Sequence, residues 1–546
     1  MAERKVGSVT YREVGAEYFE QRGLKRHAGV WSLWALGVAA VISGDFFGWN
    51  LGLPAGGFGG LAIATVVITI MYIGLCYSIA EMSPALPHTG GAYSFGRSAM
   101  GPWGGFITGL AENMEYVVTP AVVVVAIGFY MNSITIELFD LDIPLQVWWL
   151  VAYAIFVGLN IAGIETTMRF TVVVCILSLA ILVFFFIAAT TDFSVDHLTN
   201  IPPEPGNSKW LPFGIGGIFK NLPFAIWFYL AIEELPLAAE ESLDPKRDIP
   251  KATMWGLGAL VVFGVGTLIL NTGTSSGAAG IGATGEPLFQ GFKDIFGEGT
   301  GAALLALVAV VGLIASFHTI IFAYGRNIFS LSRAGYFPAW MSKTHGTRKT
   351  PYVALLLGGV VGYGLAWWIN ESSGTNVGAA LLTMAVFGAV ISYFMQMLSF
   401  ILLRRKLPNI ERPYRSPVGV AGAAIAGIIA LVSLVSLYLD DSYRPGVVGT
   451  AIWFILVSCT SGSPGGIDWC SHRKRSSRSR PERMVSPRRA TGRRTWVRSA
   501  GPDHPDDRLT ERRRAPARRR RLPTRRFDRT PARCGSRRLT PRGGSG

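Results

Sequence analysis

The stretch "VISGDFFGWNLGL", from Val41 to Leu53, places a carboxylate inside a long apolar segment. An Asp at the centre of a lipid-facing helix costs roughly 2.5–3.5 kcal/mol, so Asp45 needs a partner inside the protein. Glycine permits an unwound turn, and such a turn survives at membrane depth only where it lines a protein cavity. We therefore expect a broken helix that binds a small polar solute; the alternative is that the glycines only allow close helix packing. The candidate residues are Ser43, Gly44, Asp45, Gly48 and Asn50.

A second apolar segment, "PFAIWFYLAIEELPLAAEES" from Pro223 to Ser242, is also interrupted. Pro236 cannot donate a backbone hydrogen bond and clashes with the preceding turn, so we expect the helix to break near it. Asp45, Glu233 and Glu234 are candidates to hold an ammonium group or to carry a coupled proton, because a bound cation changes the proton affinity of a buried carboxylate. For the two glutamates, an ion pair with a neighbouring helix is the alternative. Glu233 is preferred, since Glu234 lies about 100° further round the helix and has facing water or a helix cap as a further alternative.

Aromatic and polar residues near these segments extend the candidate site. Trp227 and Tyr229, just before the second break, could stack over an amine by a cation–π contact worth roughly 0.5–2 kcal/mol; the alternative is packing or interfacial anchoring. Glu112 and Glu115 make a third apolar segment polar, and either carboxylate could line the solute pathway. His318 is a candidate proton relay, with a packing role as the alternative.

The composition is that of a polytopic membrane protein, with 50% hydrophobic and 16% charged residues. The net charge of +16 is uneven, because 26 of the 51 Lys and Arg but only 7 of the 35 Asp and Glu lie from Cys459 onward. Residues 1–458 therefore carry a net charge of −3 and give no support to nucleic-acid binding. Five scattered cysteines do not form a disulfide framework or a metal cluster. No phosphate loop or nucleophile elbow is present, so we expect neither an enzyme nor a cofactor.

Apolar runs close to the roughly 20 residues that cross a hydrocarbon core recur along the chain. We predict eleven complete spans and a doubtful twelfth near Val447, where the apolar run is too short to cross. Loops rich in Lys and Arg alternate with loops poor in them, which places the N-terminus in the cytoplasm. The first span follows a polar N-terminus and is expected to be an uncleaved signal anchor. The complete spans cover residues 31–53, 59–80, 103–131, 145–163, 171–190, 213–235, 253–271, 301–331, 352–369, 377–403 and 417–439.

The two interruptions fall in the first and sixth spans, which enter the membrane from opposite sides. Matching breaks in spans of opposite direction are typical of an inverted repeat and point to a transporter's binding site. We therefore predict an all-α polytopic membrane protein with an inverted five-helix repeat and broken helices 1 and 6. The predicted parts are a cytoplasmic N-terminus (1–30), a transmembrane domain (31–458) and a tail (459–546). The domain divides into repeat one (about 31–190), repeat two (about 213–403) and extra spans (417–458).

The tail is rich in Arg, Pro and Ser and has no apolar periodicity, so we expect it to be disordered. One interpretation is a frameshift in a GC-rich coding region, which would also truncate the twelfth span. The other is a genuine basic tail that binds anionic lipid. The nucleotide sequence distinguishes the two, because a frameshift requires an apolar continuation in another reading frame.

Charged residues on the predicted cytoplasmic face have two interpretations. They form an ion-pair gate that opens inward, or they only set the topology. The candidate cations are Arg97, Lys246, Arg247, Arg326 and Arg333, and their candidate partners are Glu81, Glu240, Glu241 and Asp248.

Three stretches resemble the amino acid–polyamine–organocation (APC) superfamily, over roughly residues 30–440. They are "AEMSPALPHTGGAYSFGRSAMGP" (Ala80–Pro102), "EELPLAAEESLDPKRDIPKA" (Glu233–Ala252) and "YGRNIFSLSRAGYFP" (Tyr324–Pro338). Within the superfamily, "SGDFFGWNLGL" together with "FYLAIEELPLAAEE" is most similar to the ethanolamine permease branch. The resemblance implies the inverted-repeat fold and uptake of amino acids or amines, by proton coupling or by exchange.

The resemblance also assigns roles to single residues. Family members commonly carry Gly-small-Gly where this chain has Gly48, Trp49 and Asn50, and the amides of that motif hold the substrate carboxylate. The departure favours a substrate with an amine and a hydroxyl but no carboxylate, to which Asn50 could both donate and accept a hydrogen bond. In the sixth helix, Glu233 aligns with a glutamate of proton-linked gating, and Ala231 is expected beside it in the site.

The coupling ion stays open between H⁺, Na⁺ and exchange. Many proton-coupled members carry a lysine in the fifth helix, where this chain has Ser178. Ser316 and Thr319 could bind sodium together with carbonyl groups of the first helix, since hard oxygen ligands suit that ion.

We therefore expect a secondary transporter of the bacterial inner membrane that imports a small cationic amine, ethanolamine in particular, by alternating access. Its expected partners are the amine and the lipid bilayer. Within transporters, the alternative is an amino acid or polyamine permease or antiporter. The alternative from another class is a sensor that binds an amine without transporting it.

Overall fold

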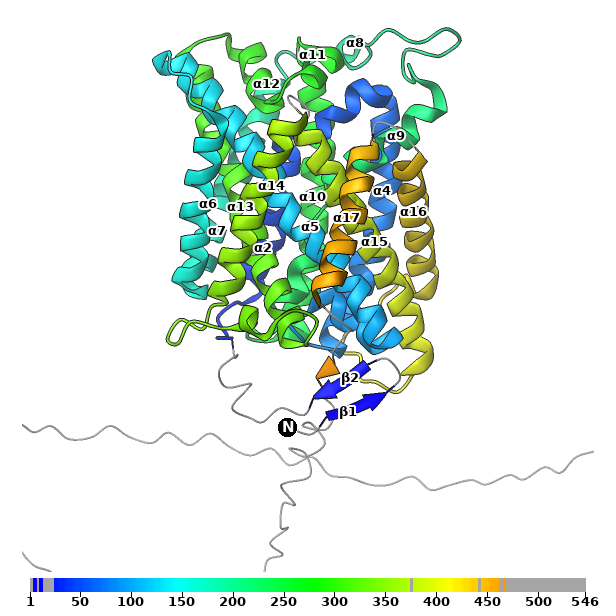
Figure 1. Ribbon diagram of the computed structural model, residues 1–546. Coiled ribbons are helices and arrows are strands. Elements are labelled where there is room, and N and C mark those ends of the chain that lie inside the picture. Colours follow the sequence, from blue (N-terminus) through cyan, green and yellow to red (C-terminus); the bar gives the residue numbers. More distant parts are fainter. Residues whose placement is uncertain are drawn as a thin grey trace, which may run out of the picture. The chain divides into compact units, whose positions relative to one another are not determined.

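The computed structural model describes residues 3–6, 9–12, 24–373, 377–439, 443–461 and 466–467 (Figure 1). The chain divides into two compact units, Met1–Ser479 and Arg480–Gly546, and every described residue belongs to the first. The second unit lies outside the described residues. So does the predicted tail, except for the end of α17 (Arg444–Ser461) and the strand β3 (Gly466–Ile467).

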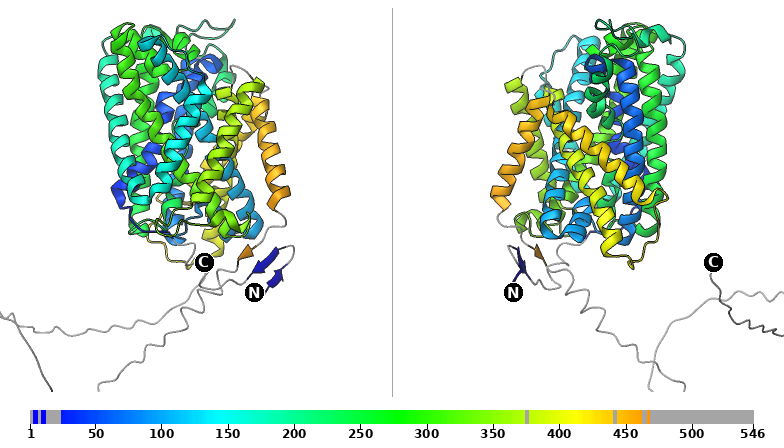
Figure 2. Two further views of the ribbon diagram at one scale, coloured as in Figure 1. Left: turned by 60° about the vertical axis from the view of Figure 1, so that its left-hand side comes forward. Right: turned by 90° about the vertical axis from the view of Figure 1, so that its right-hand side faces the viewer.

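Long helices make up most of the described part (Figures 1 and 2). Within the described ranges, nine helices are long and apolar enough to cross a membrane, and three shorter apolar helices accompany them. This confirms the prediction of an all-α polytopic membrane protein. The first repeat contains α2 (Val30–Val41), α3 (Ser43–Phe46), the 3₁₀ helix η1 (Trp49–Leu51), α4 (Gly52–Ala85), α5 (Gly91–Phe139), α6 (Leu145–Ala162) and α7 (Ile164–Ala189).

The second repeat follows the same order. It contains α9 (Gly214–Trp227), the 3₁₀ helix η2 (Ile232–Ala238), α10 (Pro245–Thr272), α13 (Thr300–Arg333), α14 (Tyr352–Ser373) and α15 (Val377–Lys406). Two further helices complete the body, α16 (Gly419–Leu439) and α17. Three short helices, α8 (Val195–Leu198), α11 (Gly277–Ala283) and α12 (Pro287–Phe296), lie at the top of Figure 1, and η3 (Ala339–Ser342) precedes α14.

The packing of the helices is reciprocal between the repeats. Helix α4, the second long helix of repeat one, packs on α9, the first of repeat two, and α10 packs on α2 in the corresponding way. The third long helices, α5 and α13, pack on each other. This interleaved arrangement is what an inverted repeat produces, and it brings the two interrupted spans into the middle of the body.

Burial separates central from peripheral helices. In α5, 78% of the most apolar 18-residue window is buried, compared with 33% in α6 and in α16. The exposed side chains of the peripheral helices are themselves apolar, as Ile155, Val173 and Ile428 illustrate. A helix that is apolar on its outward face is suited to lipid rather than water, so α5 lies in the core and α6 and α16 face the bilayer.

Short strands near the ends of the unit were not anticipated from the sequence. Strand β1 (Glu3–Val6) pairs antiparallel with β2 (Val9–Arg12), and β2 pairs parallel with β3. They form one small sheet in the order β1-β2-β3.

Candidate functional site

The first break lies between α3 and η1. Phe47 is extended, with φ −162° and ψ 152°, and Gly48 takes φ +95°. A residue with a Cβ is strained at such a positive φ, so Gly48 is the residue that permits the turn. Gly44 lies within α3 and has no positive φ. Of the candidate glycines Gly44 and Gly48, only Gly48 forms the turn.

The second break begins earlier than Pro236 suggested. Helix α9 ends at Trp227, the chain turns through 228–231, and Ala231 takes φ +84° before η2 begins. The expected position is therefore wrong by several residues. The physical reason is that the left-handed backbone of Ala231 ends the α-helical hydrogen bonding before Pro236 is reached. Pro236 then lies inside a 3₁₀ helix, where no α-helical bond remains for it to remove.

The two breaks face each other across a very short distance. A Cβ on Gly44 would lie 2.4 Å from the carbonyl oxygen of Trp227, and a Cβ on Gly48 would lie 2.6 Å from the Trp227 indole Nε1. The Trp49 ring stacks on the Phe228 ring with centroids 5.8 Å apart. Gly44 thus has the close-packing role that was the alternative interpretation, and the surface it packs against is the other break.

At each break, one backbone amide donates a hydrogen bond to the side chain two residues later in the chain. The amide of Gly48 donates to Oδ1 of Asn50 at 3.2 Å, and the amide of Ala231 donates to Oε1 of Glu233 at 3.2 Å. Both amides belong to the residue that starts the second half of a broken span. An N–H group in this position attracts anions. Here both are occupied by side chains of the chain itself.

Asn50 is fully buried and uses both ends of its amide. Its Nδ2 donates to the carbonyl oxygens of Ile281 and Thr284, at 2.9 Å each, at the end of α11 and just after it. Asn50 therefore ties the first break to the connection between α10 and α13. A hydrogen bond from Asn50 to a solute would have to replace one of these bonds.

Asp45 is only 3% exposed, and its Oδ1 has no hydrogen-bond partner among the described residues. Thr267 of α10 lies beside it. Trp227 Nε1 is buried without a partner as well, whereas the hydroxyl of Tyr229 bonds to that of Thr69 at 2.7 Å. A buried carboxylate is strongly unfavourable when it is unpaired. The breaks therefore contain a buried carboxyl group without a partner for Oδ1, and a bound cation would stabilise its charged form.

Glu233 and a second carboxylate, Glu115 of α5, both contact the same hydroxyl group. The hydroxyl of Tyr393 on α15 lies 3.0 Å from Oε1 of Glu233 and 3.4 Å from Oε1 of Glu115, and that of Tyr72 on α4 donates to Tyr393 at 2.9 Å. The Oε2 atoms of both glutamates are buried and have no partner in the described part of the chain. One hydroxyl proton cannot fully serve two carboxylates, so this cluster is able to hold and pass on a proton.

The two glutamates of α5 have different hydrogen-bond partners. Glu115 joins Glu233, whereas Glu112 accepts hydrogen bonds from the Tyr116 hydroxyl at 3.3 Å and from Nδ2 of Asn327 at 3.2 Å. Sequence reasoning missed Tyr72 and Tyr393. Both lie in apolar runs that carry no local signal of a polar site, and only the packing of α4 and α15 beside η2 identifies them.

Glu234 does not face water or cap a helix, which was an alternative interpretation for it. It is fully buried, and neither carboxylate oxygen has a partner among the described residues. The reason is that the break turns η2 into the body, where α2, α4, α5, α10 and α13 surround it. His318 fits the packing interpretation, since its Nδ1 lies 3.1 Å from Nδ2 of Asn160 and its ring lies against Phe156 and Phe170.

The candidate ion-binding hydroxyls are only partly brought together. Ser43 Oγ donates to Ser316 Oγ at 2.8 Å, and Ser316 Oγ donates to the carbonyl oxygen of Ala40 at 2.5 Å. These contacts join α13 to the first span next to its break. The hydroxyls of Thr319 and Ser178 instead donate to carbonyl groups of their own helices.

Two buried ion pairs lie at the end of the body where α2 begins, called the lower end after its place in Figure 1. Nη2 of Arg326 lies 2.9 Å from Oε1 of Glu241, and Arg333 pairs with Glu240. Burial disfavours the ionised form of Glu240, but Arg333 outweighs it and lowers the pKa of Glu240 to about 2. The backbone amide of Ala28 donates to the carbonyl of Glu241 at 3.0 Å, so the N-terminal segment is fastened over the same pairs.

Other charges at the lower end pair differently from the predicted gate. Glu81 pairs with Arg404 at 2.5 Å and with Arg412 at 3.1 Å, neither of which was a predicted partner. Lys246 forms an exposed pair with Glu411 at 3.3 Å. Exposed pairs of this kind contribute little. This end can therefore be held closed by the pairs of Glu240 and Glu241 and also by those of Glu81, whose side chain is only 2% exposed.

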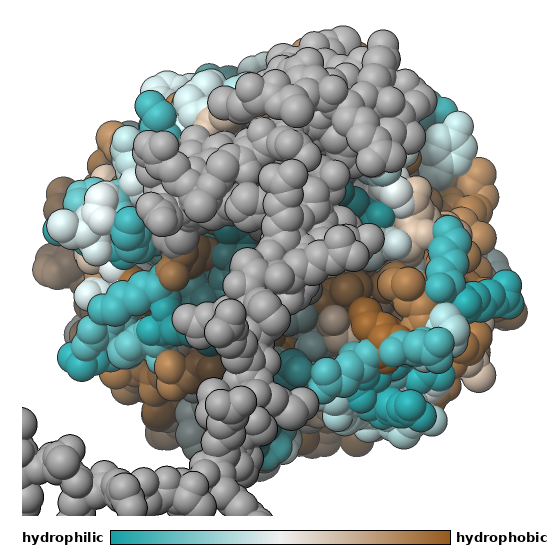
Figure 3. All heavy atoms as spheres, turned by 90° about the horizontal axis from the view of Figure 1, so that it is seen from below, coloured by the Kyte–Doolittle hydropathy of each residue, from teal (hydrophilic) through white to brown (hydrophobic). Residues whose placement is uncertain are grey.

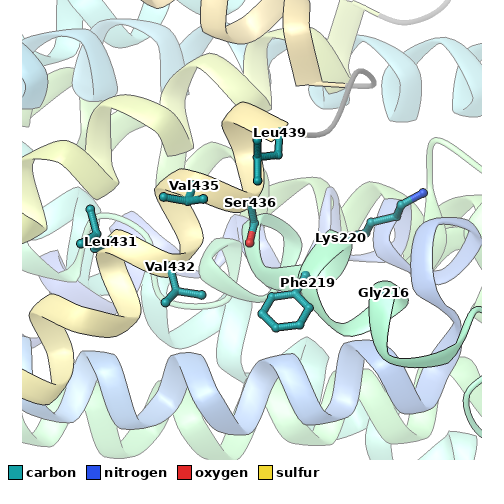
Figure 4. A pocket seen from close by; sticks show the side chains of 8 residues that line it. All are labelled: Gly216, Phe219, Lys220, Leu431, Val432, Val435, Ser436 and Leu439. Atoms are coloured by element: carbon teal, nitrogen blue, oxygen red, sulfur yellow. The ribbon is translucent and has the colours of Figure 1, made fainter.

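The site between the breaks is closed, because its side chains are buried. The groove in Figure 4, about 530 Å³ in volume, is a different feature on the outside of the body. Phe219 and Lys220 of α9 face Leu431, Val435 and Leu439 of α16 across it. None of its lining residues belongs to either break.

Comparison with known proteins identifies relatives along most of the chain. A family model described as amino acid permease matches residues 29–457. A methylthioribose transporter of Bacillus subtilis is 25% identical, over 80% of this chain and 94% of its own length. A branched-chain amino acid permease of the same organism is 24% identical, over 80% of this chain and 92% of its own length. An uncharacterized transporter of Rhizobium meliloti is 26% identical, over 76% of this chain and 87% of its own length.

Proposed function

Because the chain belongs to the amino acid permease family, we propose that it is a secondary active transporter that imports a small cationic amine, ethanolamine in particular, by alternating access. The transport occurs across the bacterial inner membrane, with the N-terminus and the lower end in the cytoplasm. The orientation rests on the distribution of Lys and Arg among the loops.

The substrate assignment rests on which polar groups at the two breaks already have hydrogen-bond partners. The amides of Gly48 and Ala231 are bound by Asn50 and Glu233, so neither is free for a substrate carboxylate. The buried Oδ1 of Asp45 has no partner in the described part of the chain. A site with an unsatisfied carboxylate and occupied amides favours a cation without a carboxylate over a zwitterion.

A second candidate, an amino acid permease, is favoured by the names of the relatives. One is a branched-chain amino acid permease, and another, of Escherichia coli, is a D-serine/D-alanine/glycine transporter. An amino acid would need the Gly48 amide, and Asn50 would have to release it first. The free energy of that hydrogen bond, about 1 kcal/mol, would then count against amino acid binding.

Coupling is assigned to the cluster at Tyr393. Glu233 accepts hydrogen bonds from the Ala231 amide and from Tyr393, so its protonation state acts directly on the geometry of the second break. Glu115 shares the same hydroxyl. A proton taken up here would weaken the bond to Ala231, because a neutral carboxyl oxygen is a poorer acceptor than a carboxylate. This links proton binding to the conformation of the substrate site.

Uptake by proteoliposomes tests the proposal. Labelled ethanolamine should accumulate, excess unlabelled ethanolamine should block uptake, and glycine or leucine should not. Asp45→Asn should lower uptake at least 30-fold while the protein keeps its thermal stability, since Asn has nearly the same size and removes only the charge. Uptake by Asp45→Asn equal to that of the wild type would remove Asp45 from the site. Binding without counterflow would favour the sensor.

A further inference from the structure

A basic cavity of about 660 Å³ opens at the lower end, between the junction of α6 with α7 and the loop that precedes α14. Three segments far apart in the sequence each contribute a cation to its wall, namely Lys25, Arg169 and Arg348. Thr166 and Thr347 add hydroxyl groups. The cavity is separate from the substrate site, because none of its lining residues belongs to the breaks or to the two buried ion pairs.

The cavity keeps an excess of positive charge. Glu165 is the carboxylate that lines it, and Glu165 pairs with Arg169 at 2.7 Å. Lys25 and Arg348 are exposed and form no salt bridge with any described residue. Lys25 and Arg348, from different segments, therefore line one cavity and have no carboxylate partner in the described part of the chain, which favours an anionic ligand with several acceptor oxygens.

The surroundings of the cavity belong to the membrane boundary. Helix α6 ends at Ala162 and α7 begins at Ile164, so the cavity lies where these two spans leave the bilayer. Phe170 and Val173 of α7 form an apolar side of the cavity. The outward face of α7 continues apolar beyond it, with Val173 57% and Ile176 55% exposed. Figure 3 views the lower end and shows polar clusters beside apolar patches there.

We propose that this cavity binds the anionic headgroup of a phospholipid, whose acyl chains lie along α7. A lipid headgroup and a free phosphate ion both present a phosphate group to such a cavity. The apolar face of α7 favours the lipid, because a headgroup bound beside it can keep its acyl chains in the bilayer, whereas a free ion gains nothing from this face. Basic pockets at the cytoplasmic ends of transmembrane helices suit anionic headgroups, and each Lys or Arg near an anionic surface contributes about 1 kcal/mol.

Lipid titration of the purified full-length protein in neutral detergent tests the proposal, with bound lipid counted by native mass spectrometry. Phosphatidylglycerol should bind more tightly than phosphatidylcholine. The double variant Lys25→Ala/Arg348→Ala should bind phosphatidylglycerol about 30-fold more weakly, which corresponds to about 2 kcal/mol from two cations. The control Arg247→Ala/Lys251→Ala removes the same charge from exposed positions at the start of α10 and should leave the affinity unchanged within twofold.

Three results would overturn the assignment. Equal binding of the two lipids would exclude recognition of an anionic headgroup. Equal losses of phosphatidylglycerol affinity in both double variants would show that binding depends only on the net charge of the protein. Protection of the protein against thermal unfolding by millimolar inorganic phosphate, as strong as that by phosphatidylglycerol, would assign the cavity to the free ion. The measurement does not involve ethanolamine, so its outcome is independent of the proposed substrate.

Discussion

Replacing Gly44 by Ala tests whether the two breaks must touch for transport to occur. The added Cβ would lie 2.4 Å from the backbone carbonyl oxygen of Trp227. An ordinary carbon–oxygen contact is about 3.3 Å, so the two broken spans must separate by about 1 Å. Backbone on both sides leaves no flexible side chain to give way. Overpacking of this kind costs about 1–3 kcal/mol, and a misplacement of about 1 Å at a reacting or binding site lowers rates about 100-fold.

The assay is the initial rate of ethanolamine uptake by proteoliposomes, together with thermal unfolding of the purified variant. Gly44→Ala should lose about two orders of magnitude in uptake while most of its folded protein remains. Gly258→Ala is the matched control, since Gly258 also lies in a membrane helix and a Cβ there would meet nothing within 4 Å. Its uptake should stay within twofold of the wild type. Wild-type uptake by Gly44→Ala would refute the reasoning. An equal loss of uptake in Gly258→Ala would show that replacing any glycine of a membrane helix lowers uptake.

Two further predictions concern the carboxylates. Glu233→Gln keeps an oxygen for the Ala231 amide but removes the titrating group, so uptake should lose its dependence on pH between about 5.5 and 8 while ethanolamine exchange continues; an unaltered pH profile in this variant would contradict the coupling role. Glu240→Gln should lower the free energy of unfolding by about 2 kcal/mol, because it removes a charged hydrogen-bond partner of Arg333. The pKa of Glu240 is lowered to about 2 in the folded protein, so the carboxylate's stabilisation is complete above its unfolded pKa of about 4.3 and is lost only as the pH falls through 2. His88 lies 3.4 Å from Arg333, so unfolding is compared at pH 8 and pH 9, above the ordinary range of an imidazole at about 6.5. The difference from the wild type should be the same at both values, and a difference that changes between them would exclude the ion pair as its origin.

The sequence by itself determined the membrane class, most spans and the presence of two breaks. These features depend on local composition, because the free energy of placing a residue in lipid is set by its own type and its near neighbours. A carboxylate with three glycines in one apolar run, and a Glu-Glu-x-Pro motif in another, are visible without knowing any contact. The same local reasoning misplaced the second break, since it weighted Pro236 and had no means of finding the left-handed backbone of Ala231.

Only the tertiary structure decided how these groups are paired. Tyr393 contacts both Glu233 and Glu115, which lie 160 and 278 residues away from it in the sequence. Arg326 pairs with Glu241, which lies 85 residues away. The packing of η2 among five helices buries Glu234, for which the sequence had left both a site role and a water-facing role open. Pairing and burial of this kind depend on which helix faces lie against each other, and the hydropathy of a segment specifies that a face is buried but not which partner buries it.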